Sequence, residues 1–251
     1  MTVVLVGVFE PKNEHENSMM LERKGLVDRL QNEGLNCVEV KSQWPRDDFT
    51  FHRDKIYFRK NEEHYADGGY VRAYPEFTIA CEAVGENDET GRKDSIEKRT
   101  AKLKKLYGNH IQIVPNPNYA LNQELRPHSD MVLFPIPEKK ALFVDETYFG
   151  AHRKLVEEFG ERYGLRVIRV SQDYHNPSWP CNTISVKHND SMVNVTNAGV
   201  SSEFIAKLES LGNKVIAVPF MNNAVSGGSI NCATNLIPKN RLGDLREIYE
   251  F

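Results

Sequence analysis

The chain has few cysteines, no long apolar run and almost no net charge. Only four of its 251 residues are cysteines, and they lie far apart, without the spacing of metal ligands: Cys37, Cys81, Cys181 and Cys232. The formal net charge of −3 leaves no excess of basic residues for binding nucleic acid. We therefore expect reduced thiols in a cytoplasmic protein, with no metal, no cofactor and no nucleic-acid partner.

The apolar segments are all of strand length. The first, Met1 to Val8, is too short to span a membrane and lacks the basic flank of a signal peptide, so a buried strand is expected there. Hydrophobic residues make up 40% of the chain and charged residues 27%, as in ordinary globular proteins. We expect one domain over residues 1–251 and no membrane partner.

A pattern of amphipathic helix, glycine cap and apolar strand recurs along the chain. Helical periodicity predicts helices at 20–32, 95–107, 151–163 and 202–211. Apolar pairs around turns predict hairpins at 49–58, 131–144 and 183–195. A further pair, 70–74 with 77–80, has no clear helix before it and is interpreted as a degenerate unit. The pattern predicts an α/β fold of about five ββαβ modules that stack or close into a ring.

The polar segment 85–93 separates two of these units. Its composition is typical of an exposed loop, and a mobile lid is the alternative interpretation.

Cys232 differs from the other cysteines because its neighbours, from Gly227 to Asn235, are polar and small. Glycines allow a sharp turn, which we expect to leave the sulfur accessible. Because a thiol attacks as the thiolate, an accessible cysteine in such a turn indicates a nucleophile. A buried cysteine near a glycine-rich turn is the alternative.

His128 precedes an apolar strand, and Asp130 follows it by two residues. Residues i and i+2 of a strand point to the same face, so we expect the imidazole and the carboxylate to project together. An imidazole can move protons near neutral pH. A histidine on a surface loop is the alternative.

Two more carboxylates lie beside turn residues. Asp67 precedes Gly68 and Gly69, and Asp47 follows Arg46 in a short segment between a strand and a hairpin. The alternative for Asp67 is that it only forms the turn, and the alternative for Asp47 is that it lies in a solvated loop.

Taken in order, the segments 44–48, 67–69, 128–130 and 227–235 resemble the guanidine-modifying enzymes of the pentein superfamily. This superfamily includes arginine deiminase, agmatine deiminase, dimethylarginine dimethylaminohydrolase and the amidinotransferases. The resemblance implies a five-bladed α/β propeller of ββαβ modules, which agrees with the repeat described above. It also implies a small cationic guanidino substrate, and the flat exterior faces of a propeller would allow a homodimer.

The resemblance implies a role for each matching residue. Cys232 would be the nucleophile and His128 the general acid and base, oriented by Asp67. Asp47 and Asp130 would bind the guanidinium. The candidates for binding a substrate carboxylate are Arg46, Arg72 and Arg126, for each of which a surface charge is the alternative.

The residue types at some positions do not fit a single subgroup of the superfamily. Asp67 stands where deiminases usually have Glu and dimethylarginine dimethylaminohydrolases have Asp, whereas the segment 128–130 is similar to the deiminases. Asn231 matches no subgroup. Asn13 and Asn17, in an expected polar loop, are similar to asparagines that dihydrolases use. The sequence therefore predicts a hydrolase of arginine or an arginine derivative, with an amidinotransferase or a non-catalytic binding protein of the same fold as alternatives.

Overall fold

The computed structural model describes residues 1–82, 96–117, 128–172 and 178–250. Its internal contacts divide the chain into two compact units, Met1–Pro45 with Gln172–Phe251, and Arg46–Ser171. The single domain expected from the sequence stays a prediction.

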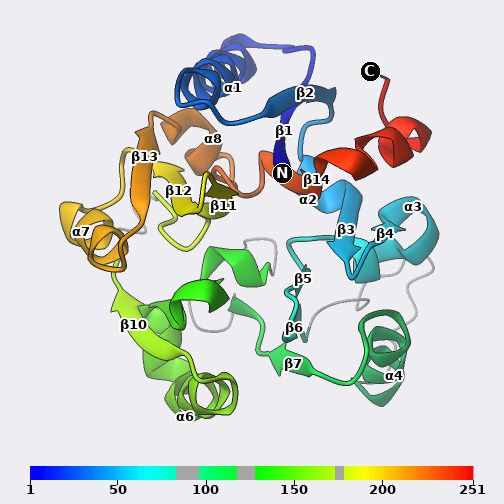
Figure 1. Ribbon diagram of the computed structural model, residues 1–251, viewed down its shortest axis with the longest axis vertical. Helices are drawn as coiled ribbons and strands as arrows, with labels where there is room; N and C mark the ends of the chain where they lie inside the picture. Colours follow the sequence, from blue (N-terminus) through cyan, green and yellow to red (C-terminus); the bar gives the residue numbers. More distant parts are fainter. Residues whose placement is uncertain (83–95, 118–127, 173–177, 251) are drawn as a thin grey trace. The chain divides into compact units, whose positions relative to one another are not determined.

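The first unit contains a sheet made from both ends of the chain. Its order is β14 (Thr234–Pro238), β1 (Thr2–Val8) and β2 (Cys37–Lys41). β14 is antiparallel to β1, and β1 is parallel to β2. The helix α1 (Glu14–Asn32) connects β1 to β2 and lies alongside them (Figure 1).

The second sheet of this unit contains β11 (Ile184–His188), β12 (Ser191–Asn197) and β13 (Lys214–Val218). α7 (Ser202–Ser210) connects β12 to β13, which are parallel. The two sheets share a core of buried aliphatic side chains from β1, α1, β11, β12 and β13, including Val4, Leu26, Val186, Val195 and Ile216. The remaining elements are α8 (Met221–Val225) and the 3-10 segment η4 (Lys239–Glu247).

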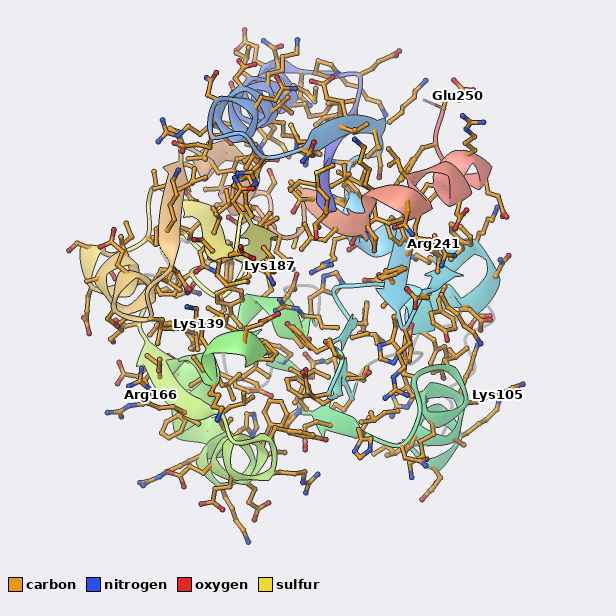
Figure 2. The ribbon with its side chains drawn as sticks, viewed as in Figure 1. Lys105, Lys139, Arg166, Lys187, Arg241 and Glu250 are labelled. Carbon is orange, nitrogen blue, oxygen red and sulfur yellow. The ribbon has the colours of Figure 1, made fainter. Side chains whose placement is uncertain are left out.

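The second unit contains three sheets. The first is the hairpin of β3 (Phe49–His52) and β4 (Lys55–Phe58). The second contains β5 (Val71–Ala73), β6 (Thr78–Cys81) and β7 (Ile111–Val114), with α4 (Ile96–Tyr107) before β7. The third contains β8 (Leu133–Ile136), β9 (Ala141–Asp145) and β10 (Arg166–Val170), with α6 (Glu146–Tyr163) before β10. Charged side chains such as Lys105 on α4 and Arg166 on β10 are exposed (Figure 2).

Short helical segments connect these strands. They are α2 (Pro45–Asp48), α3 (Arg59–Glu62), η1 (Glu63–Ala66), η2 (Ser129–Met131) and η3 (Pro137–Lys139).

The expected modules are present in the described residues, but with different boundaries. In each of four sheets, two antiparallel strands are followed by a helix and then by a third strand that is parallel to the second. The fifth sheet contains only β3 and β4. The pair interpreted as degenerate, β5 and β6, belongs to a complete module whose helix follows it. The ββαβ repeat is confirmed, and closure of the sheets into a propeller stays a prediction.

Helix ends follow the expected glycine signals. The residues after the four predicted helices all have positive φ values, which glycine adopts without strain: Gly34, Gly108, Gly164 and Gly212. The expected polar loop after the first strand is wrong, because α1 already begins at Glu14. Asn13 caps it by accepting from the N–H of Glu16, and Asn17 lies inside the helix.

Two other boundaries differ from the expectation. α6 begins five residues before the predicted start at Ala151, because Asp145 caps it by accepting from the N–H of Tyr148. β8 begins at Leu133 because the 3-10 turn η2 occupies residues 129–131. The predicted loop at 85–93 lies outside the described residues. In the part of the chain that is described, no helix combines the length and the apolar character needed to cross a membrane.

Candidate active site

Asp47, Asp67 and His128 come together in the second unit. A carboxylate oxygen of each aspartate and a ring nitrogen of the histidine lie within 4.8 Å of one another. A carboxylate oxygen of Asp130 lies equally close to a ring nitrogen of His128. All four side chains are buried, with exposed fractions of 0% to 4%. The second unit therefore holds three buried carboxylates around one imidazole, an arrangement that favours a cationic ligand.

Asp67 is fixed by the turn that follows it. Its Oδ1 accepts hydrogen bonds from the N–H of Gly69 at 2.9 Å and from that of Tyr70 at 3.4 Å. The same oxygen lies 3.8 Å from Nε2 of His128. The ring of Tyr70 meets the imidazole edge-on, with centroids 4.8 Å apart. Asp67 therefore both shapes the turn and faces the histidine, and its role in orienting a catalytic imidazole stays a prediction.

The two glycines after Asp67 are needed for close packing. A Cβ on Gly69 would lie 2.1 Å from Nδ1 of His128, and a Cβ on Gly68 would lie 2.5 Å from Cδ of Arg46. The carbonyl of Gly69 accepts from the N–H of Ser129 at 3.0 Å, which ties the histidine segment to this turn. Only glycine lets the imidazole approach the backbone so closely.

Asp130 lies close to His128, but the backbone between them does not have the expected conformation. The prediction of an extended strand at this point is wrong, because Asp130 lies in the 3-10 turn η2. Backbone bonds from Met131 to His128 and from Val132 to Ser129 close this turn. The turn, and not strand alternation, brings the carboxylate to the imidazole side.

The same residues could ligate a metal ion by distance alone, since Asp47, Asp67 and His128 each offer one atom. However, Arg59 places its Nη1 3.6 Å from Oδ2 of Asp67. A guanidinium there already supplies positive charge to this carboxylate, which disfavours the binding of a divalent cation.

The three candidate arginines have different environments. Arg46 is half-buried and packs over Gly68. Arg72 is buried, and its Nη1 donates to the carbonyl of Leu133 at 2.8 Å, so the interpretation as a surface charge is wrong for this residue. Arg126 lies outside the described residues.

Cys232 lies in the first unit and is buried, with an exposed fraction of 5%. The expectation of an accessible sulfur is therefore wrong. The glycine-rich turn packs inward, because a Cβ on Gly228 would lie 2.8 Å from Cζ3 of Trp44 and 3.1 Å from Cβ of Cys232. All four cysteines are free thiols, as expected, and Cys81 and Cys181 are buried in the core.

Asn182 organises this turn, and sequence reasoning missed it. Its Oδ1 accepts from the backbone N–H groups of Ser229 and Cys232, each at 3.1 Å, and its Nδ2 lies 3.1 Å from Sγ of Cys232. Its carbonyl accepts from the N–H of Asn231 at 3.0 Å. Because 50 residues separate Asn182 from Cys232, no local sequence signal connects them.

Arg23 is the second residue that the sequence did not indicate. It is fully buried on α1, where apolar periodicity alone was visible. Its Nη1 donates to the carbonyls of Gly7 and Gln43. Burial lowers the pKa of Arg23 to about 10, against the opposing effects of Cys232 and Glu22, so the guanidinium remains charged at neutral pH.

No family model and no curated protein matches the sequence. Solved structures match over nearly the whole chain. The N-terminal domain of ArgZ, an arginine dihydrolase from the ornithine-ammonia cycle in cyanobacteria, is 14% identical. The match covers 95% of this chain and 98% of that domain, with a TM-score of 0.67. Of full-length ArgZ, the chain covers 40%.

Two other structures have the same fold. The agmatine deiminase of C. jejuni is 13% identical, with 93% of this chain and 92% of that one covered and a TM-score of 0.62. A dimethylarginine dimethylaminohydrolase adduct is 12% identical, with 94% and 99% covered and a TM-score of 0.61. The chain therefore has the fold of the pentein guanidine-modifying enzymes, as the sequence resemblance implied.

Proposed function

We propose that the protein is a cysteine-dependent hydrolase that acts on the guanidinium group of arginine or an arginine derivative. The observation that carries this proposal is the buried group of Asp47, Asp67 and Asp130 around His128. A guanidinium is a planar cation with several N–H donors, and paired carboxylates bind it through charge-assisted hydrogen bonds. Asp47 and Asp130 would hold the substrate, and Asp67 would orient the imidazole.

In the proposed reaction, the thiolate of Cys232 attacks the guanidinium carbon and a C–S bond forms. His128, as the imidazolium, gives its proton to a nitrogen of the tetrahedral adduct, and that C–N bond breaks. Ammonia or an alkylamine leaves, and an amidino-thioether remains on Cys232. His128 then takes one proton from water, whose oxygen attacks the same carbon. The C–S bond breaks and the remaining hydroxyl proton passes to solvent, which returns the thiolate and leaves a neutral ureido product.

The neighbours in structure support a covalent route. The ArgZ domain has been captured covalently bound to a reaction intermediate, and a cysteine-to-serine variant of it has been captured with substrate. These facts belong to ArgZ. They support the proposal because the present chain has the same fold and carries a cysteine, a histidine and carboxylates in segments that resemble the motifs of the pentein enzymes. A cytoplasmic location and a homodimer stay predictions.

Mass spectrometry of reaction mixtures tests the proposal. The protein is incubated with arginine, agmatine, methylated arginines and acylated arginines, beside the variant Cys232→Ala. We expect a ureido or ornithine-like product and ammonia or an alkylamine from at least one substrate, and none from the variant. Product only when an amine acceptor is added would instead establish an amidinotransferase. Product from the variant would exclude Cys232 as the nucleophile, and no product or adduct on any substrate would favour a binding protein.

A further inference from the structure

We infer that Asn182 and Arg23 hold Cys232 as a thiolate before substrate binds. The inference rests on the proposed role of Cys232 as the nucleophile. It concerns two positioning residues, both in the first unit, that stabilise the charge on the sulfur and do not touch the reacting carbon.

The orientation of the Asn182 amide is fixed by its hydrogen bonds. Its Oδ1 accepts from two backbone donors, the N–H groups of Ser229 and Cys232, so this atom must be the oxygen and not the nitrogen. The atom 3.1 Å from Sγ of Cys232 is therefore the NH₂ group, a donor. A hydrogen bond donated to sulfur stabilises the thiolate more than the neutral thiol.

Arg23 supplies a full positive charge that cannot move away. Its guanidinium donates to Gly7, Gln43 and Asn223, and it stacks against Trp44 with 4.8 Å from Cζ to the ring centroid. Among the described residues its Nη2 has no hydrogen-bond partner.

The indole of Trp44 links this charge to the cysteine turn. The guanidinium of Arg23 lies over the indole. A Cβ added at Gly228 would lie 2.8 Å from Cζ3 of this indole and 3.1 Å from Cβ of Cys232, so the indole and the cysteine both lie close to Gly228. The electrostatic coupling is consistent with this geometry, because the charge of Cys232 raises the pKa of Arg23. Coupling is reciprocal, so the charge of Arg23 must favour the thiolate of Cys232 equally.

Burial opposes this effect, because a buried thiolate loses its hydration. Glu22, which precedes Arg23 on α1, also carries negative charge near Arg23, but the backbone N–H groups of Asn222 and Asn223 donate to its carboxylate. Both the donor of Asn182 and the positive charge of Arg23 on α1 are therefore required for the thiolate to predominate at neutral pH.

The ultraviolet absorbance of thiolate, followed against pH, tests the inference without any turnover. The signal of Cys232 is the difference between the wild type and Cys232→Ser. We expect a midpoint below the ordinary thiol value of about 8.5. Asn182→Asp keeps the oxygen that accepts from the backbone but replaces the donor with a negative charge, and should raise the midpoint by about 1 unit or more.

Arg23→Met should also raise the midpoint, by about 1 unit, a tenfold loss of thiolate at neutral pH. Arg29→Met is the matched control, since it removes the same charge from the same helix at an exposed position and should change nothing. If Arg23→Met does not fold, Arg23→Lys keeps the charge and should leave the midpoint within about half a unit.

The proposed reaction also brings His128 and Asp130 to the substrate. The same titration in His128→Ala and in Asp130→Asn measures any contribution of these two groups to the titration midpoint of Cys232. A wild-type midpoint at or above that of an ordinary thiol would overturn the inference. Equal midpoints for Arg23→Met and Arg29→Met, or a shift in Arg23→Lys as large as in Arg23→Met, would do so as well. Because no substrate is used, these results are independent of whether the proposed hydrolysis occurs.

Discussion

Replacing Gly69 by alanine should displace the imidazole of His128. The new Cβ would lie 2.1 Å from Nδ1 and 2.5 Å from both Cε1 and Cγ, whereas ordinary contact begins at 3.4 Å. The ring must therefore move by roughly 1.3 Å, because rotation cannot relieve a clash with three of its atoms. The edge-on ring of Tyr70 limits the space available for that movement.

A displacement of about 1 Å in a reacting group lowers the rate by roughly 100-fold. The crowding should also reduce the free energy of unfolding by about 1–3 kcal/mol. We expect Gly69→Ala to fold, to lose about two orders of magnitude in kcat with a smaller change in KM, and to melt at a lower temperature. Product formation by mass spectrometry and thermal unfolding measure the two effects.

Gly150→Ala is the matched control in the same unit. Gly150 lies on α6, and a Cβ there would meet no atom within 4 Å. Because alanine has a higher helix propensity than glycine, this variant should be slightly more stable and fully active. If Gly69→Ala kept both the kcat and the melting temperature of the wild type, the close approach of the histidine to this backbone would be refuted.

Two further predictions concern pH and metal ions. Burial, aided by the charge of Arg53, lowers the pKa of His52 in the folded protein, so below about pH 6.5 the unfolded chain binds a proton that the folded protein does not. The melting temperature should therefore fall between pH 7 and pH 5, and the fall should be shallower in His52→Phe; equal slopes would contradict this. Because Arg59 already supplies positive charge to Asp67, a chelator such as EDTA should leave turnover unchanged, and a loss restored by a divalent ion would reveal a metal site.

Much of the local structure followed from short sequence patterns. Amphipathic periodicity predicted the helices, and glycines after them predicted the caps, because a left-handed residue at a helix end strongly favours glycine. The sequence did not predict the first turns of α1, since polar residues there carry no apolar periodicity, nor η2, since a single 3-10 turn has no pattern of its own. The module built from β14 and β1 was also invisible, because its strands lie at opposite ends of the chain.

By itself, the sequence determined the main helices, the ββαβ repeat and the candidate residues Cys232, His128, Asp47, Asp67 and Asp130. Each lies in a short motif whose residue types fit one chemistry. Only the tertiary structure decided which side chains lie together: the carboxylates around the imidazole, and the amide of Asn182 on the sulfur. Contacts of this kind join residues tens of positions apart, and they depend on burial and close packing, which local propensity does not encode.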